Sequence, residues 1–190
     1  MKYFILFGPP GAGKGTQAAF IAGRYNLRHI STGELLRSEI AAGSELGKKA
    51  AALIEDGQFV PDQVVEDMIR GQFDTVRGVD GFLLDGFPRT LAQAEALDRM
   101  LGERGEQVTS VISLMIPDET VKLRIRRRAA IEHRADDASD EIIGHRIAAY
   151  HEKTEPIIAF YKKQGKYHEV DSTGTIEEVR DGAFALMDTL

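Results

Sequence analysis

The chain has 190 residues, of which 43% are hydrophobic and 28% charged, enough to bury a core and typical of a soluble globular protein. A net charge of −6 argues against nucleic acid as the main partner, and the absence of cysteine excludes disulfides, thiol catalysis and cysteine-based zinc sites. No apolar stretch approaches the roughly 18 residues that span a bilayer, and the apolar run at Tyr3 to Phe7 is too short for a signal peptide. We therefore expect a cytoplasmic protein without a membrane partner.

Strand-like and helix-like segments alternate along the chain, which predicts a parallel sheet with helices on both faces. In the first half we expect, in chain order, a strand at Lys2 to Phe7, a helix at Lys14 to Tyr25, helical patterns at Gly33 to Ala42 and Leu46 to Glu55, and a strand at Gly81 to Asp85. In the second half we expect a strand at Val108 to Met115, a helix from Asp118 to about Arg128, a long helix at Ser139 to Lys163, a strand at Tyr167 to Val170 and a helix at Ile176 to Met187.

Two segments depart from this simple alternation. From about Ser31 to Pro61 the two helical patterns have no strong strand signal between them, so we interpret this segment as a helical insert beside the sheet. In the long helix, Ser139 is expected to be the N-cap. Pro156 should bend that helix or split it in two, because proline lacks the backbone N–H that a helix interior needs.

The sequence Gly8-Pro-Pro-Gly-Ala-Gly-Lys-Gly-Thr16 stands between the first strand and the first helix, which is the context of a phosphate-binding loop. Its glycines allow backbone N–H groups to point at phosphate oxygens, and the helix N-terminus adds partial positive charge. Lys14 adds a full charge suited to the β- and γ-phosphates. The loop is not the dinucleotide fingerprint, because Thr16 occupies the position of its third glycine.

A second motif, Asp85-Gly-Phe-Pro-Arg89, follows the strand at Gly81 to Asp85. A carboxylate at the end of a buried strand near a phosphate loop is where a Mg²⁺-organising residue belongs, although Asp85 is also compatible with a turn or a helix cap. Arg89 lies in the loop beyond, as an anion-binding residue or as a solvated charge.

Arginines gather in the last third of the chain. They are Arg124, Arg126, Arg127, Arg128, Arg134 and Arg146. In a chain with a phosphate loop this cluster favours a charged clamp over ATP, with a solvated face as the alternative. Arg126 and Arg127 are expected to be surface charges. The histidines form no metal or triad pattern, and we interpret all five as structural or solvated: His29, His133, His145, His151 and His168.

The Gly-Lys-Gly-Thr form of the loop resembles the nucleoside monophosphate kinases, and the adenylate kinase family in particular, and the resemblance covers nearly the whole chain. It implies an α/β P-loop three-layer sandwich with a five-stranded parallel sheet. Residues 1–190 would form a single domain, with a helical monophosphate-binding insert at about 31–60 and a short lid at about 128–138. The implied reaction is reversible phosphoryl transfer from ATP to AMP, giving two ADP, with Mg²⁺ accompanying ATP, no zinc, and a monomeric enzyme.

The resemblance also implies residue roles. ATP binding falls to Gly11, Ala12, Gly13, Lys14, Gly15, Thr16, Arg128 and Gly174. AMP binding falls to Thr32, Arg37, Gln58, Phe59, Val60, Gly86, Phe87, Pro88, Arg89, Gln93, Arg134 and Arg146. The catalytic set is Lys14, Asp85, Arg89, Arg128, Arg134 and Arg146. Asp85 and Thr16 are the candidates for organising Mg²⁺, through water.

The choice of AMP depends on a few of these positions. The family pattern gives Gln93 the adenine edge, which an amide with one donor group and one acceptor can match. Taken alone, Gln93 is typical of a surface helix residue and Thr32 of a helix cap. The related uridylate and cytidylate kinases usually carry Ala where Thr32 stands and Asn where Thr90 stands, so both positions favour AMP.

Three alternatives remain open from the sequence. The first is a kinase of UMP or CMP with the same fold. The second is a non-kinase P-loop switch that hydrolyses ATP slowly, which would leave the Asp85 to Arg89 motif unexplained. The third is a small-metabolite kinase such as shikimate kinase, against which Thr32, Arg37 and Gln93 count.

Overall fold

The computed structural model describes residues 1–55, 60–132 and 139–190. Its strands are β1 (Lys2–Phe7), β2 (Leu27–Ser31), β3 (Gly81–Asp85), β4 (Ser110–Met115) and β5 (Tyr167–Asp171). Over the described residues these form one five-stranded sheet in the order β2-β3-β1-β4-β5, with every neighbouring pair parallel. The expected α/β fold with a five-stranded parallel sheet is therefore confirmed.

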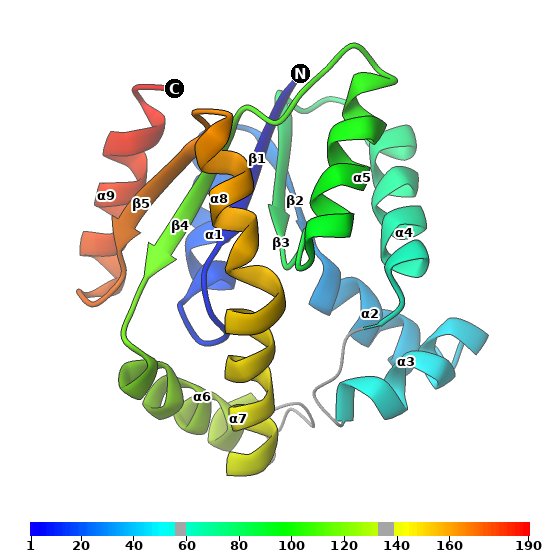
Figure 1. Ribbon diagram of the computed structural model, residues 1–190, viewed down its shortest axis with the longest axis vertical. Helices are drawn as coiled ribbons and strands as arrows, with labels where there is room; N and C mark the ends of the chain where they lie inside the picture. The colour runs from blue at the N-terminus through cyan, green and yellow to red at the C-terminus, as the bar shows by residue number, and fades with distance from the viewer. Residues whose placement is uncertain (56–59, 133–138) are drawn as a thin grey trace.

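The helices follow the expected alternation. They are α1 (Lys14–Arg24), α2 (Thr32–Ala41), α3 (Glu45–Glu55), α4 (Asp62–Thr75), α5 (Leu91–Gly102), α6 (Asp118–Glu132), α7 (Asp140–Ala149), the π-helical turn η2 (Tyr150–Thr154), α8 (Pro156–Lys163) and α9 (Ile176–Met187). Figure 1 shows α2 and α3 to the lower right of the sheet and α6 and α7 below it. No helix among the described residues combines the length and apolarity needed to cross a membrane.

The sheet forms the middle layer because its central strand is apolar on both faces. Tyr3, Ile5 and Phe7 of β1 pack in one core with apolar side chains of α4, α5 and α8. Phe4 and Leu6, which point the other way, pack in a second core with α1 and α9. Helices thus cover both faces of the sheet, as Figure 1 shows. The ends of the strands remain available for a binding site.

The strand β2 was not predicted, although a five-stranded sheet was. It lies at the edge of the sheet, next to β3, and only Leu27 and Ile30 are buried. With Arg28 and His29 between them, the segment lacks the continuous apolar run that marks a strand buried on both faces. The helix α4 was also missed, although Val65, Ile69 and Phe73 have the spacing of one buried helix face.

The long helix expected from Ser139 to Lys163 is divided into α7, η2 and α8. Ser139 is the N-cap, and its hydroxyl accepts from the Ile142 N–H at 3.3 Å. Pro156 stands at the first position of α8, where a missing N–H does no harm. The Glu155 N–H donates to the Tyr150 carbonyl five residues earlier, at 2.8 Å, which is the hydrogen bond of a π-helix. The prediction that Pro156 bends or splits this helix is confirmed, since a new helix begins at that residue.

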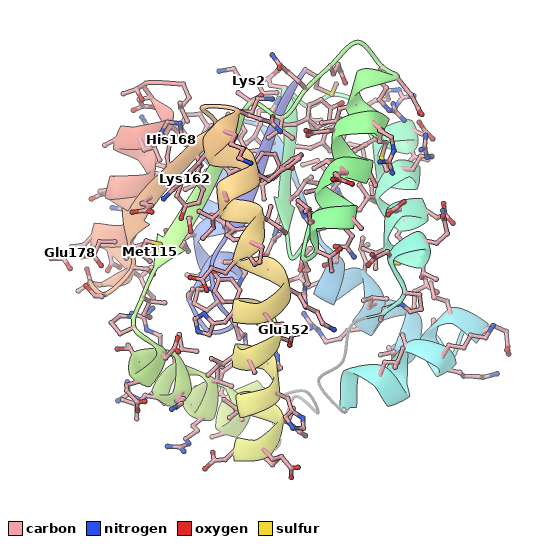
Figure 2. All side chains as sticks on the ribbon, viewed as in Figure 1. Lys2, Met115, Glu152, Lys162, His168 and Glu178 are labelled. Carbon is pink, nitrogen blue, oxygen red and sulfur yellow. The ribbon has the colours of Figure 1, made fainter. Side chains whose placement is uncertain are left out.

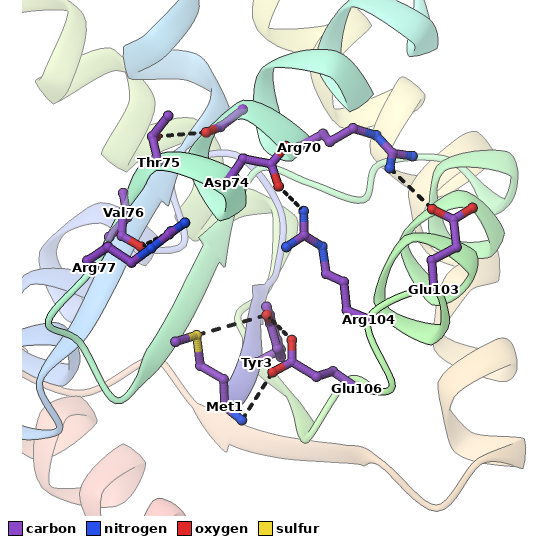
Figure 3. Close-up of polar contacts among 11 residues, drawn as sticks. Met1, Tyr3, Arg70, Asp74, Thr75, Val76, Arg77, Glu103, Arg104 and Glu106 are labelled. Atoms are coloured by element: carbon purple, nitrogen blue, oxygen red, sulfur yellow. Dashed lines mark hydrogen bonds and ion pairs between the residues drawn. The ribbon is translucent and has the colours of Figure 1, made fainter.

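Polar contacts stabilise the end of the sheet at which the first strand begins. Lys2, the first residue of β1, and Met115, the last of β4, lie at opposite ends of the sheet (Figure 2). At the Lys2 end, the Tyr3 hydroxyl donates to the Glu106 carboxylate, and the amino terminus pairs with the same carboxylate at 3.3 Å (Figure 3). Burial and the neighbouring Glu106 carboxylate raise the pKa of Tyr3, which keeps the phenol a donor.

We expect Glu106→Ala to lower the free energy of unfolding by about 1–3 kcal/mol, because it leaves the hydroxyl of a buried tyrosine without its acceptor. Glu103→Ala is the matched control, since Glu103 pairs with Arg70 on the surface and should contribute less than about 1 kcal/mol (Figure 3). Urea denaturation of both variants measures the difference. Equal losses for the two would contradict the role given to Glu106.

Candidate active site

A cavity of about 580 Å³ lies at the carboxyl ends of β1 and β3, where the strand order places the phosphate loop next to Asp85. Loops and helices from both halves of the chain line it. The lining consists of Phe7, Gly8, Pro10, Gly11, Gly13, Lys14, Gly15, Thr16, Ser31, Thr32, Gly33, Glu34, Leu36, Arg37, Val60, Val65, Asp85, Gly86, Pro88, Arg89, Gln93, Arg124, Arg128, Arg146, Tyr150 and Thr154.

The phosphate loop curls tightly at the start of α1. Gly13 is the N-cap of α1 in the left-handed conformation, with φ 91°, which residues with a side chain rarely adopt. The Lys14 ammonium folds back into the loop and donates to the carbonyl oxygens of Gly8 at 2.8 Å and Pro9 at 2.9 Å. The loop therefore places a cation and the N-terminus of α1 against the same part of the cavity.

The environment of Lys14 disfavours its charge. Burial lowers the pKa of Lys14 to about 8; the Asp85 carboxylate opposes this shift, and the guanidinium groups around the cavity add to it. An anionic ligand bound beside Lys14 would stabilise its charged form, because the ligand's charge offsets the cost of burying the ammonium group.

Asp85 ends β3, and its side chain is 12% exposed. Burial alone would raise the pKa of its carboxyl, but His29, Lys14 and Arg89 outweigh that effect and lower it. The His29 Nε2 is buried and lies 3.6 Å from Oδ2 of Asp85, slightly beyond hydrogen-bond distance. Asp85 is thus an ionised carboxylate among cations, and His29, which was interpreted as structural or solvated, lies beside it.

Gly86 allows two predicted side chains to meet. Its carbonyl accepts from the Thr32 hydroxyl at 2.9 Å and from the Arg89 Nε at 2.8 Å. A Cβ on Gly86, which has φ 81°, would lie 2.6 Å from the Thr32 hydroxyl oxygen and 2.9 Å from an Arg89 nitrogen. Thr32 is not the helix cap that its sequence suggests: the neighbouring Ser31 caps α2, and its hydroxyl accepts from Glu34.

Gln93 is 2% exposed, so it is not the surface helix residue of which its sequence, taken alone, is typical. Its Oε1 accepts from the backbone N–H of Arg89 at 2.7 Å, and its Nε2 donates to the Asp62 carboxylate at 2.7 Å. Thr90 caps α5 by accepting from the Gln93 N–H at 3.2 Å, and its own hydroxyl donates to the same Asp62 carboxylate at 3.3 Å. These contacts join the start of α4 to the start of α5.

Positive side chains surround the cavity. Besides Lys14, they are Arg37, Arg89, Arg124, Arg128 and Arg146. Such a concentration in a chain of net charge −6 indicates an anionic ligand of high charge. Arg126 instead pairs with Asp140 at 2.8 Å on the surface, and Arg127 is exposed, as predicted for both.

The cavity gathers most of the predicted residues, but three of those that the structure describes do not line it. Ala12 and Phe87 are buried behind the lining. Gly174 lies in the β5–α9 loop, next to the phosphate loop, since the Ser172 hydroxyl donates to the Ala12 carbonyl at 2.8 Å. Gln58, Phe59, His133 and Arg134 lie outside the described residues, as does most of the segment 128–138.

Arg124, Tyr150 and Thr154 are among the lining residues for which the sequence predicted no role. Arg124 belonged to the arginine cluster but received no role; it stands four residues before Arg128 and therefore on the same helix face. Its guanidinium donates to the Ser172 carbonyl at 2.9 Å. Tyr150 and Thr154 follow Arg146 at steps of four, and this spacing could have marked them.

Within the described part of the chain, no three His, Asp or Glu side chains come together in a way that could hold a metal ion. Asp85 and Thr16 both line the cavity and offer one carboxylate and one hydroxyl. This donor set fits a hard cation that takes most of its ligands from phosphate oxygens and water.

The comparisons with known proteins agree on one family. The family model described as Adenylate kinase matches residues 6–166. The chain is 47% identical over 182 residues to an adenylate kinase of Synechococcus sp. (strain RCC307), covering 95% of this chain and 96% of that protein. It is 44% identical over 183 residues to one of Thermobifida fusca, with 96% of both chains covered, and 41% identical over 190 residues to one of Bacteroides fragilis, with both covered in full. The chain belongs to the adenylate kinase family.

Proposed function

We propose that this protein transfers a phosphoryl group reversibly from ATP to AMP, giving two ADP. The observation that carries the proposal is a single cavity lined both by the phosphate loop with Lys14 and by Arg37, Arg89 and Gln93. Membership of the adenylate kinase family supports the same reaction.

The test is a nucleotide-specificity assay on the purified chain, with Mg²⁺ and ATP supplied and AMP, UMP, CMP and GMP compared as acceptors. We expect ADP to form from AMP at a rate well above that for the other three. Preference for UMP or CMP would instead identify a pyrimidine monophosphate kinase. Hydrolysis of ATP with no transfer to any monophosphate would overturn the proposal.

On the ATP side, the backbone of the phosphate loop and Lys14 would hold the phosphates. Arg124 and Arg128 line the cavity from α6 and would act on the same nucleotide. Asp85 and Thr16 would hold Mg²⁺ through water. Mg²⁺ bound there would neutralise part of the negative charge of the phosphates.

On the AMP side, Arg37 and Arg89 would bind the phosphate, and Gln93 would read the base. The helices α2 and α3, which follow β2 directly, would form the monophosphate-binding insert. Val60, Val65 and Leu36 line the cavity with apolar side chains and would pack against the ring. The segment 128–138 would form the lid, with Arg134 in it and Arg146 beside it.

Phosphoryl transfer of this kind depends on position and charge more than on proton transfer. The attacking atom would be a phosphate oxygen of AMP. The second pKa of that phosphate is about 6, so the group is mostly ionised at neutral pH. No general base is needed, because the acceptor oxygen is already ionised. Closure over the substrates would exclude water and limit hydrolysis of ATP.

We expect the protein to be a cytoplasmic monomer.

The position of Lys14 leads to a prediction about protons. Because the pKa of Lys14 is lowered to about 8, Lys14 is only partly protonated at pH 8.5, and phosphates bound beside it would raise its pKa. ATP binding with Mg²⁺ should therefore take up part of a proton at pH 8.5 and much less through Lys14 at pH 7. Calorimetry in two buffers of different ionisation enthalpy measures the uptake. Buffer-independent binding enthalpies at pH 8.5 would contradict the placement of Lys14 against the phosphates.

A further inference from the structure

The Gln93 amide is held at both of its ends. Its Oε1 accepts from the Arg89 backbone N–H and its Nε2 donates to Oδ1 of Asp62, both at 2.7 Å. Asp62, the first residue of α4, does not line the cavity, while Gln93 does. The Thr90 hydroxyl donates to the other carboxylate oxygen of Asp62 at 3.3 Å. Asp62 thus lies behind Gln93 as seen from the cavity.

These two partners allow only one orientation of the amide. A backbone N–H can only donate and a carboxylate can only accept, whereas a glutamine amide can be turned over to exchange its oxygen and nitrogen. If Gln93 were turned over, its oxygen would face the Asp62 carboxylate and its NH₂ would face the Arg89 N–H. Both hydrogen bonds would be lost, one of them to a charged group and therefore the stronger kind.

The orientation matters because the two kinds of purine present opposite edges. Adenine offers a donor at its 6-amino group and an acceptor at N1, whereas guanine and hypoxanthine offer an acceptor at O6 and a donor at N1. After its two contacts inside the protein, the Gln93 amide has one lone pair and one hydrogen left for a base. An amide free to turn over could match either edge; one that is fixed matches only one.

We propose that Asp62 is a positioning residue that determines acceptor specificity: by fixing the Gln93 amide, it makes the site accept 6-aminopurine monophosphates and reject 6-oxopurine monophosphates. The inference rests on the proposed function, in which Gln93 reads the base of the acceptor nucleotide. It assigns the discrimination to a side chain that does not itself touch the base.

The test compares AMP with IMP, which differ only at the edge that Gln93 would read. In Asp62→Asn the charge is lost, and the new amide can either accept from or donate to Gln93, so the turned-over state loses one hydrogen bond in place of two. We expect the ratio of kcat/KM for AMP to that for IMP to fall at least about tenfold. Most of the change should appear in KM, since the base lies away from the transferred phosphoryl group.

Two controls separate this role from a general effect on structure. Asp67→Asn makes the same chemical change on the same helix, where Asp67 accepts from Gln63 on the surface, and should leave the ratio unchanged. In a Gln93→Ala background, Asp62→Asn should no longer alter the ratio, because the amide through which it acts is gone. Calorimetric binding of AMP and IMP to the same variants gives a readout that does not depend on turnover.

The outcomes are distinct from those that test the proposed function. If the unmodified protein phosphorylates no monophosphate, the proposed function fails. If it prefers AMP over IMP and Asp62→Asn preserves that ratio, only the role of Asp62 is overturned. A change of the ratio that persists in the Gln93→Ala background would also overturn it.

Discussion

Replacing Arg89 with alanine should lower kcat for phosphoryl transfer from ATP to AMP by at least about 10²-fold. The guanidinium group lines the cavity and is held by the Gly86 carbonyl at 2.8 Å, so it is fixed before substrates bind. A fixed cation stabilises charge on a transferring phosphoryl group without reorganising during the reaction. Steady-state rates on folded protein measure the loss.

The fold should survive this change, because the backbone of Arg89 has partners of its own. Its N–H donates to Gln93, and its carbonyl accepts from the Thr154 hydroxyl at 2.7 Å. Arg126→Ala, which removes an arginine from a surface ion pair, serves as the control and should stay within a few-fold of the unmodified rate. Turnover of Arg89→Ala at the level of that control would refute the assignment.

Replacing Lys14 with methionine should reduce kcat/KM by at least about 10²-fold and also change how stability depends on pH. Since the pKa of Lys14 falls from 10.5 to about 8 on folding, the unfolded chain holds more protons between these values. The contribution of Lys14 to stability therefore rises with pH through this window, and below about pH 8 the folded state bears the full penalty of the charge.

Denaturant unfolding of both proteins between pH 7 and pH 10.5 tests this second effect. The stability of the unmodified protein should rise relative to that of Lys14→Met as the pH increases across that range. Parallel profiles for the two proteins would show that burial does not disfavour the ammonium group in the folded state.

Local features of this site could be read from the sequence. The phosphate loop is a continuous segment whose glycines, lysine and flanking elements all stand next to one another in the chain, so its position before α1 was predictable. Asp85 could be placed because it directly follows an apolar strand. Pro156 could be expected to divide its helix because proline itself lacks the backbone N–H, so no distant contact is needed to predict the division.

Features that depend on distant contacts could not be read in this way. Gln93 is buried because Asp62, 31 residues earlier, accepts its NH₂ group, and no local pattern connects the two. The strand β2 is an edge strand in which only Leu27 and Ile30 are buried, so its pairing with β3 is needed to recognise it. Arg124 was visible as a charge, but its place in the cavity follows from how α6 packs.

The π-helical turn η2 gives the helical rod from α7 to α8 one place where a residue can be lost. Arg146 precedes the turn, and Tyr150 and Thr154 are its first and last residues. All three line the cavity, and Thr154 also donates to the Arg89 carbonyl. Because a π-helical turn holds about one residue more than an α-helical turn, deleting one residue between Tyr150 and Thr154 should restore α-helical geometry and leave α8 close to its present orientation. A single-residue deletion within α7 or α8 would instead rotate the residues beyond it by about 100°, so a deletion library should tolerate losses in η2 before losses in those helices.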